Sequence, residues 1–231
     1  MKHALIFAAG RGERMRPLTD ATPKPLLKVA GKRLIEHHLE KLALAGVREV
    51  VINTSHLAER FPAALGDGAR WDLRIHYSYE GPTPLETGGG MRRALQWLGD
   101  APFIAVSADI WSDYDYAQLA ARGLPAGDAW AHLVMVPNPD FHARGDFFLD
   151  GARLFDDGAG ERLTFANIGV YRAALLAGQA EGAFKLLPMY QRAMRAGKLD
   201  GERYDGAWWN VGTPEQLAQL DAAVSRQRAC A

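Results

Sequence analysis

The first 25 residues constrain the fold more than any other part of the chain. Residues 4–9, the apolar run Ala-Leu-Ile-Phe-Ala-Ala, predict a buried strand. The strand leads into Gly10 and Gly12 and then into a loop rich in arginine and proline that closes on Pro23-Lys24-Pro25. A strand that brings glycines and cations to one edge of a sheet is typical of a polyphosphate site, because backbone N–H groups and fixed positive charge meet there. The alternative is a solvated turn with scattered basic residues.

The spacing of this loop differs from the two commonest phosphate-binding motifs. Methionine occupies the third glycine place of the dinucleotide fingerprint, and the Lys-Ser/Thr pair of a Walker A loop is missing. The chain has instead G-x-G-x-R-x-x-P-x-T, followed by P-K-P. We expect the backbone around Gly10, Gly12 and Glu13 to face the phosphates. Arg14 and Lys24 would supply positive charge where a transferring phosphate accumulates negative charge.

Composition indicates the cellular setting. The 27 Lys and Arg residues balance the 27 Asp and Glu residues, so no overall charge attracts nucleic acid or a membrane surface. The single cysteine, Cys230, excludes a disulfide framework. No apolar run is long enough for a signal peptide or a membrane span. We therefore expect a cytoplasmic protein without a nucleic-acid or membrane partner.

The 231 residues alternate between strand-like and helix-like segments in the first half of the chain. This order predicts an α/β fold with a doubly wound, mostly parallel sheet. The second half adds further strands, a small hairpin and two helices, which makes the predicted sheet mixed. We expect a single domain over residues 1–231. The expected strands are 4–9, 49–53, 72–79, 103–107, 130–136 and 163–172, with a hairpin over 146–155; the expected helices are 34–42, 56–65, 89–98, 184–196 and 213–226.

Two segments suggest a metal site. Asp109 follows the apolar strand 103–107, and ligands of an open parallel sheet bind beyond the carboxyl ends of its strands. A carboxylate there suits Mg²⁺ shared with phosphate oxygens, although strand-end aspartates also cap turns. Asn210 precedes Val-Gly-Thr-Pro, in which Thr213 is the expected N-cap of a helix. Its side-chain carbonyl suits either a cation or the backbone of its own turn.

A third segment, Leu85-Glu-Thr-Gly-Gly-Gly90, is expected to open a helix. Three glycines at this place would let a flat ligand such as a nucleobase or ribose lie against the backbone. A flexible loop is the alternative. His38, on the apolar face of the predicted helix 34–42, lacks the histidine partner of a zinc motif, so we expect it to be packed in the core.

Together these motifs resemble the sugar-1-phosphate nucleotidyltransferases, from residue 3 to about residue 220. The resemblance implies a three-layer Rossmann-like fold, a nucleotide-binding half over about 1–112 and a sugar-binding half over about 113–220. It implies Mg²⁺ as cofactor, a nucleoside triphosphate and a sugar 1-phosphate as substrates, and a monomer or small homo-oligomer. The catalytic residues by resemblance are Arg14, Lys24 and Asp109; the nucleotide-binding residues are Gly10, Gly12, Glu13, Arg14, Lys24, Glu80, Thr87 and Gly88; the metal ligands are Asp109 and Asn210. Asparagine at 210 replaces the aspartate usual in the family, which leaves Asp205 as an alternative ligand.

Within the family, the chain most resembles short bacterial uridylyltransferases that act on N-acetylmuramate 1-phosphate in peptidoglycan recycling. The likeness lies in residues 85–90, 107–111, 165–171 and 210–217. It implies UTP as the donor and sugar contacts from Ser107, Gly145, Asp146, Glu161 and Asn167. Mannose 1-phosphate with GTP, or glucose 1-phosphate with a thymidine or uridine nucleotide, are the alternative substrate pairs. A weakly catalytic sensor that binds a nucleotide sugar is the alternative of another class.

Overall fold

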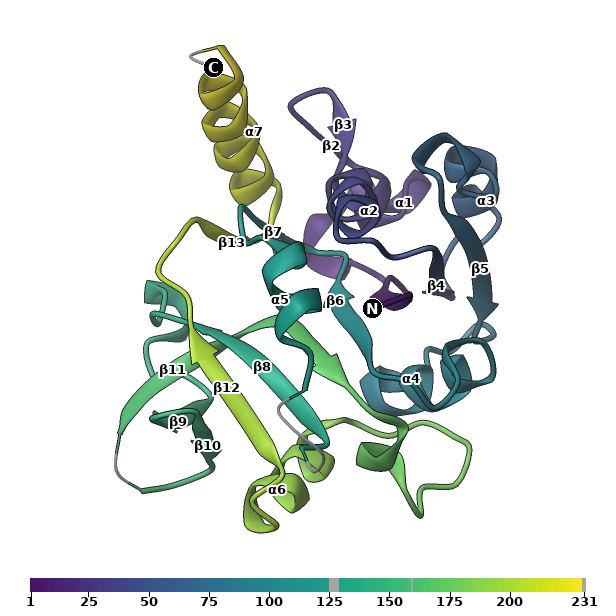
Figure 1. The fold of residues 1–231 in the computed structure, drawn as a ribbon. Coiled ribbons are helices and arrows are strands. Elements are labelled where there is room, and N and C mark those ends of the chain that lie inside the picture. The colour runs from purple at the N-terminus through teal and green to yellow at the C-terminus, as the bar shows by residue number, and fades with distance from the viewer. Residues whose placement is uncertain (125–128, 159, 230–231) are drawn as a thin grey trace.

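A nine-stranded mixed sheet runs through the described part of the chain, which in this computed structural model comprises residues 1–124, 129–158 and 160–229 (Figure 1). Its order is β5-β4-β1-β6-β11-β8-β12-β10-β9, and β9 also pairs with β11. The strands are β1 (His3–Phe7), β4 (Glu49–Thr54), β5 (Arg74–Tyr79), β6 (Phe103–Ser107), β8 (Ala131–Val136), β9 (Phe147–Asp150), β10 (Arg153–Phe155), β11 (Glu161–Tyr171) and β12 (Leu199–Arg203). Cys230 lies outside the described residues.

The four strands β5, β4, β1 and β6 are parallel. From β1 the chain moves outward to β4 and β5 and then returns to the other side of β1 to form β6. The strand order therefore reverses between β1 and β6, and this is where open α/β sheets bind ligands. The expected Rossmann-like arrangement is confirmed.

Antiparallel pairing prevails in the rest of the sheet. β11 runs antiparallel to β6, β8 and β9, whereas β12 is parallel to β8. The predicted mixed sheet is confirmed, with its continuous parallel part in the first half of the chain. β12 was not predicted, because its sequence Leu-Asp-Gly-Glu-Arg is largely polar and has no strand-like apolar run.

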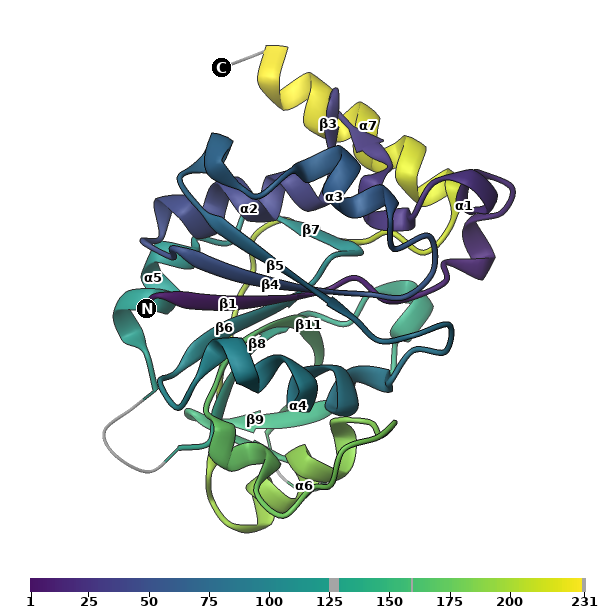
Figure 2. The ribbon, with the colours of Figure 1, turned by 90° about the vertical axis from the view of Figure 1, so that its right-hand side faces the viewer.

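Helices cover both faces of the sheet and complete the expected three layers (Figure 2). The strand period of two sends successive side chains to opposite faces. Ile6 packs with the α2 side on one face, whereas Leu5 packs with Met91 of α4 on the other. One face carries α2 (Leu34–Leu44), α3 (Arg60–Leu65) and α5 (Tyr116–Arg122); the other carries α4 (Glu86–Leu98) and α6 (Leu187–Arg195).

A third, smaller core lies beneath α7 (Pro214–Ala229). There Met15 and Leu220 pack against the antiparallel ribbon of β7 (Ile110–Ser112) and β13 (Trp208–Asn210). This core ties the opening loop to the C-terminal helix. The remaining short elements are η1 (Glu13–Met15), α1 (Leu18–Ala21), η2 (Lys24–Leu26), β2 (Lys28–Val29), β3 (Lys32–Arg33), η3 (Ala69–Trp71), η4 (Asp140–His142) and η5 (Ala173–Leu176).

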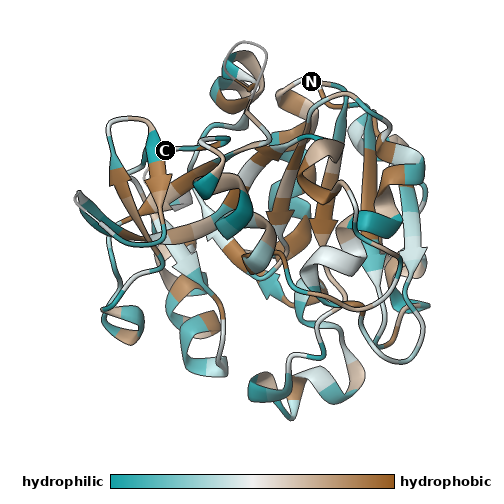
Figure 3. Cartoon of the chain, turned by 90° about the horizontal axis from the view of Figure 1, so that it is seen from below, coloured by the Kyte–Doolittle hydropathy of each residue, from teal (hydrophilic) through white to brown (hydrophobic). Residues whose placement is uncertain are grey.

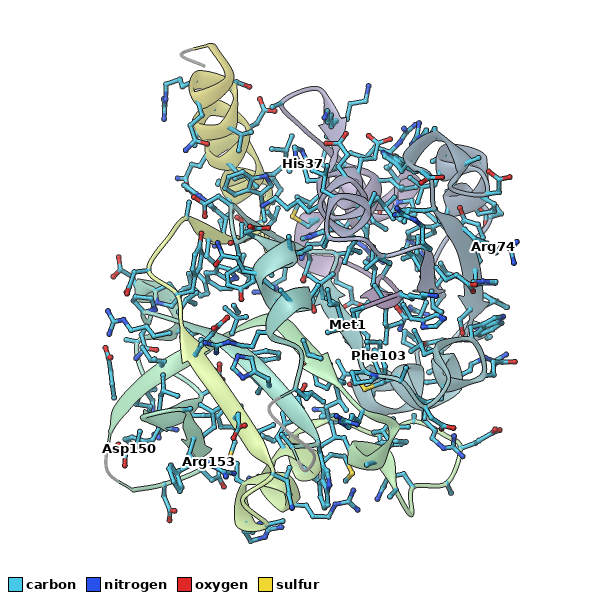
Figure 4. All side chains as sticks on the ribbon, in the orientation of Figure 1. Met1, His37, Arg74, Phe103, Asp150 and Arg153 are labelled. Carbon is cyan, nitrogen blue, oxygen red and sulfur yellow. The ribbon has the colours of Figure 1, made fainter. Side chains whose placement is uncertain are left out.

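Hydrophobic residues concentrate on the strands, and polar residues lie on the outer surfaces of the helices (Figure 3). Arg74 lies on β5, an edge strand of the sheet. Asp150 and Arg153 lie opposite each other in the strand ladder, where β9 turns into β10 (Figure 4). Charged residues at edges discourage pairing with other chains. Among the described residues, no helix has the length and apolarity needed to cross a membrane.

Candidate active site

A cavity of about 540 Å³ opens at the carboxyl ends of the parallel strands, beside the point where the strand order reverses. The opening loop forms one wall, and the segments after β5 and β6 form the others. The lining residues are Phe7, Ala8, Ala9, Gly10, Arg11, Gly12, Glu13, Arg14, Lys24, Pro25, Asn53, Glu80, Pro84, Glu86, Thr87, Ser107, Asp109 and Gly212. The structure thus brings the loop and Asp109 together around one space.

The two glycines of the opening loop have different environments. Gly12 has a φ of +64°, and its carbonyl accepts a hydrogen bond from Thr19 Oγ1 at 2.9 Å. A Cβ at Gly12 would lie 3.0 Å from Thr19 Cγ2, whereas one at Gly10 would meet no protein atom within 4 Å. Gly12 therefore shapes the loop, and Gly10 keeps its cavity side open. Fully buried Met15 anchors the loop, which explains why methionine replaces a glycine there.

An ion pair joins the end of the loop to the end of β6. Lys24 Nζ donates a hydrogen bond to Asp109 Oδ2 at 2.9 Å. The Lys24 side chain is only 9% exposed, whereas that of Asp109 is 42% exposed. A cation with so little access to water interacts strongly with any anion that enters the cavity.

The β7–β13 ribbon makes Asp109 and Asn210 neighbours. Asn210 pairs with Ile110, the residue after Asp109, and Val211 N donates to the Asp109 carbonyl at 2.9 Å. Neither Asn210 nor Asp205, the alternative ligand, is among the residues that line the cavity, and Asp205 forms an ion pair with Arg203 at 2.7 Å.

The carboxylate of Asp109 fits a Mg²⁺ site that is shared with a substrate. This ion is usually held by one or two carboxylates together with water and substrate phosphates, not by a complete protein cage. Accordingly, the residues described here contain no group of three or more His, Cys, Asp or Glu side chains that would enclose an ion by themselves. Asp109, which lines the cavity, therefore suits a metal that arrives with a nucleotide, whereas Asn210 is placed near it only through the backbone of the ribbon.

The start of α7 lies beside the Arg14 side chain. Thr213 Oγ1 accepts a hydrogen bond from Gln216 N at 3.3 Å, and Gln216 Oε1 accepts one from Thr213 N at 3.1 Å. This reciprocal capping confirms Thr213 as the expected N-cap. A Cβ at Gly212 would lie 3.4 Å from Arg14 Nη2, an ordinary contact distance, so Gly212 and the guanidinium are neighbours where both line the cavity.

Asn53, which the sequence analysis missed, orders the opposite wall. Its Oδ1 accepts from Ala8 N at 2.6 Å, and its Nδ2 donates to Glu80 Oε1 at 2.7 Å. Glu80 Oε2 accepts from Leu85 N at 2.7 Å, and burial raises the pKa of Glu80. Both Glu80 oxygens thus have protein partners, so Glu80 shapes the wall. Asn53 could have been found from its place near the end of a parallel strand.

The glycines at 88–90 have a different role from the one expected. Phe184 covers Gly88, the carbonyl of Gly182 covers Gly89, and a Cβ at Gly90 would lie 2.5 Å from Glu80 Oε1. Gly88 does not line the cavity, although Thr87 does. These glycines allow neighbouring protein segments, not a ligand, to approach helix α4 closely.

A second cavity of about 380 Å³ adjoins the first and shares Phe7, Glu86, Thr87 and Ser107 with it. Asn167 lines this second cavity from an irregularity in β11, where it has a φ of +59°. Asparagine tolerates this left-handed conformation better than most residues, and such bulges redirect side chains. The complete lining is Phe7, Glu86, Thr87, Ala105, Ser107, Asp146, Phe147, Phe165, Asn167, Tyr171, Lys185, Leu186, Leu187 and Tyr190.

Of the five expected sugar contacts, the structure brings Ser107, Asp146 and Asn167 together in this second cavity. Asp146 accepts a hydrogen bond from Phe165 N at 2.8 Å. Gly145 lies behind it at φ +62°, where a Cβ would be 2.5 Å from Asn138 Oδ1. Glu161 is exposed, forms an ion pair with Arg203 and lines neither cavity.

A cation-lined cavity next to a polar and aromatic one, both at the switch point of a Rossmann-like sheet, is the arrangement of an enzyme that joins a nucleotide to a second ligand. Residues 3–143 match the family model described as nucleotidyl transferase. The chain belongs to this family, as the opening motif led us to expect.

Individual relatives cover almost the whole chain. It is 44% identical to the N-acetylmuramate alpha-1-phosphate uridylyltransferase of Neisseria meningitidis serogroup B, over 95% of this chain and 96% of that protein. It is 36% identical to the enzyme of the same name from Caulobacter vibrioides, over 97% of both chains. A mannose-1-phosphate guanyltransferase of Aspergillus fumigatus is 32% identical over 93% of this chain and 62% of its own length.

The fold also matches solved structures. A putative glucose-1-phosphate thymidylyltransferase from Bacillus anthracis superimposes with a TM-score of 0.82 at 16% identity, covering 97% of this chain and 96% of that one. At this identity the likeness concerns the fold alone, and it confirms the predicted fold class.

Proposed function

We propose that the protein transfers a uridylyl group from UTP to N-acetylmuramate 1-phosphate, giving UDP-N-acetylmuramic acid and pyrophosphate in peptidoglycan recycling. The observation that carries the proposal is the Lys24–Asp109 pair in the cavity at the switch point, with a second cavity beside it. The 44% identity to a relative of this activity supports the choice of substrates. The reaction would take place in the cytoplasm, where UTP is available.

The proposed reaction is an in-line displacement at phosphorus. An oxygen of the sugar 1-phosphate forms a bond to the α-phosphorus of UTP, and the bond from this phosphorus to the β-bridging oxygen breaks, so pyrophosphate leaves. Such a transfer needs positioning and charge neutralisation and does not need a protein nucleophile. Ser107 and Phe7, which line both cavities, mark the boundary across which the two substrates would meet.

The loop residues would act on the triphosphate. The backbone around Gly10, Gly12 and Glu13 would face its phosphates, Arg14 would stabilise the departing pyrophosphate, and Lys24 would bridge the reacting phosphates. The low exposure of Lys24 supports this role, because charge interactions strengthen where water is excluded.

Asp109 and Asn210 would hold Mg²⁺ together with phosphate oxygens. When bound, the ion would neutralise charge on the triphosphate and on the leaving pyrophosphate. Lys24, already paired with Asp109, keeps the carboxylate at the end of β6 and supplies positive charge on the same side of the cavity.

A substrate screen tests the proposal. Pyrophosphate release would be followed with Mg²⁺ and UTP in the presence of N-acetylmuramate 1-phosphate, N-acetylglucosamine 1-phosphate, glucose 1-phosphate or mannose 1-phosphate. We expect release with the muramate, whereas release only with another sugar would refute the proposed substrate.

A second candidate is transfer from GTP to mannose 1-phosphate, which the identity to the Aspergillus fumigatus guanyltransferase favours. Repeating the screen with GTP and thymidine triphosphate covers it. Nucleotide binding without pyrophosphate release under any combination would instead support a sensor, with Asn210 as the residue to replace by aspartate.

A further inference from the structure

The second cavity has a single cationic residue at its mouth. Among the described residues that line it, Lys185 is the only lysine, arginine or histidine. It is exposed, and within the described part of the chain it forms no ion pair and no side-chain hydrogen bond. A free cation at this place can bind an anion that a substrate brings.

Hydrogen bonds to the start of α4 fix the backbone around Lys185. Gly88 N and Gly89 N donate to the Phe184 carbonyl at 2.8 and 3.1 Å, and Phe184 N donates to the Leu85 carbonyl at 3.2 Å. On the other side of Lys185, Leu186 N donates to Thr87 Oγ1 at 3.1 Å. The glycines at 88 and 89 allow this close approach, because a side chain at either position would collide with residues 182–184.

The rest of the cavity makes a cation necessary for any acidic substrate group. Its floor is aromatic and apolar, including Phe147, Phe165 and Tyr190, and such a floor cannot solvate a charge. Its other charged residues are Glu86 and Asp146, which would repel a carboxylate. Lys185 is thus the one positively charged side chain among the described lining residues.

We propose that Lys185 recognises the lactyl carboxylate of the sugar substrate and thereby selects N-acetylmuramate 1-phosphate over N-acetylglucosamine 1-phosphate. The inference rests on the proposed function. The two sugars differ by the lactyl ether at carbon 3, which adds one carboxylate and one methyl group. The carboxylate would pair with the Lys185 ammonium, and the apolar floor would receive the methyl group. A charge-assisted contact of this kind gives selectivity, because only the sugar that carries the carboxylate can form it.

The test uses two substitutions of the same residue and one control. Lys185→Met removes the charge and keeps much of the side-chain length, and Lys185→Arg keeps the charge. Lys2→Met removes an exposed lysine just before β1, at the opposite end of the strand from the site. Each variant would be assayed for KM and kcat with N-acetylmuramate 1-phosphate, and for the Ki of N-acetylglucosamine 1-phosphate as a competitor.

For Lys185→Met we expect the KM for N-acetylmuramate 1-phosphate to rise roughly 10- to 100-fold, the magnitude typical of a lost hydrogen bond to a charged group. The Ki of N-acetylglucosamine 1-phosphate should stay within about twofold, since that sugar lacks the carboxylate. Lys185→Arg should restore most of the affinity, and Lys2→Met should match the wild type.

Two results would overturn the inference. An unchanged KM in Lys185→Met would show that the residue does not contact the substrate. An equal loss for both sugars would show that Lys185 contacts a part that they share, such as the phosphate. The wild-type assay separates these results from a failure of the proposed function: a wild-type enzyme inactive with N-acetylmuramate 1-phosphate refutes the function itself.

Discussion

Lys24 and Asp109 form the contact on which the proposed chemistry depends at the scale of single residues. The Lys24 side chain is buried, whereas the Asp109 side chain is partly exposed to water. Removing the carboxylate would leave a buried cation without its counter-charge, which usually destabilises a protein. Asparagine at 109 keeps the shape and an oxygen that can accept a hydrogen bond from Lys24 but not the charge, so the stability of the variant has to be measured beside its activity.

We expect Asp109→Asn to lower kcat for pyrophosphate release roughly 100- to 1,000-fold, because it removes the carboxylate proposed to hold Mg²⁺ at the reacting phosphates. The activity should be measured over a range of Mg²⁺ concentrations, and a thermal melt should show that the variant is folded. Wild-type activity in Asp109→Asn would contradict the assignment.

The two loop glycines provide a matched pair of substitutions. Gly12→Ala forces alanine into a left-handed conformation beside Thr19 and should lower the free energy of unfolding by about 1–2 kcal/mol. Gly10→Ala meets no protein atom and should leave stability unchanged while weakening UTP binding. Urea unfolding and the KM for UTP measure the two effects. Equal stability of both variants would argue against the different roles of the two glycines.

At the scale of secondary-structure elements, His38 connects α2 to the strand that follows Asp109. Its Nε2 donates to the Ile110 carbonyl at 2.8 Å, and its Nδ1 accepts from the Tyr116 hydroxyl at 2.8 Å. The side chain is fully enclosed, as the sequence led us to expect. Neutral imidazole satisfies both contacts, whereas the protonated form would lose the acceptor.

This buried histidine predicts how stability depends on pH. Burial lowers the pKa of His38 from 6.5 to about 4, and the positive charge of Lys41 contributes. Between these two values the unfolded chain binds a proton that the folded chain does not. The contribution of His38 to the free energy of unfolding is therefore complete above pH 6.5. Below pH 6.5, and down to the folded pKa of about 4, it falls by about 1.4 kcal/mol per pH unit.

Urea unfolding at about pH 7.5 and about pH 5 should thus show a larger loss of stability for the wild type than for His38→Gln, whose side chain does not titrate in this range. The same loss in both proteins would exclude His38 as the titrating group.

The irregularity in β11 is the second element that bears on the site. Asn167 has a φ of +59°, which alanine adopts less readily than asparagine or glycine. Asn167→Ala should therefore lower the free energy of unfolding by about 1 kcal/mol, whereas Asn167→Gly should not. Both remove the amide from the second cavity and should raise the KM for the sugar phosphate by roughly 2- to 10-fold, the effect of one lost hydrogen bond. The KM for UTP serves as the control. An unchanged sugar KM in both variants would remove Asn167 from the proposed sugar contacts.

At the scale of the whole molecule, the sequence predicted the part of the fold in which each strand is an apolar run. The strands β1, β4 and β6 are largely buried, and each contains a run of at least three consecutive hydrophobic residues that is easily recognised. β12 and the β7–β13 ribbon are polar or very short, and only their long-range partners make them strands. Residues 184–186, expected to begin a helix, instead lie along the start of α4.

The same distinction applies to the candidate site. The loop at 10–25 and Asp109 were predictable, because their spacing and their place at a strand end are local properties of the sequence. Asn53 and Lys185 were missed, because their relation to the cavities depends on segments far away in the chain. The glycines at 88–90 were recognised as significant, but the sequence did not reveal that a protein segment covers them.

The activity proposed for this protein is the transfer of the uridylyl group of UTP to N-acetylmuramate 1-phosphate. The most direct test is to incubate the protein and Mg²⁺ with this sugar phosphate and UTP radiolabelled at its α-phosphorus, and to separate the products. We expect the label to move into UDP-N-acetylmuramic acid as pyrophosphate is released, and Asp109→Asn to nearly abolish this transfer. Label that remains in UTP, or that appears only in UMP, would contradict it.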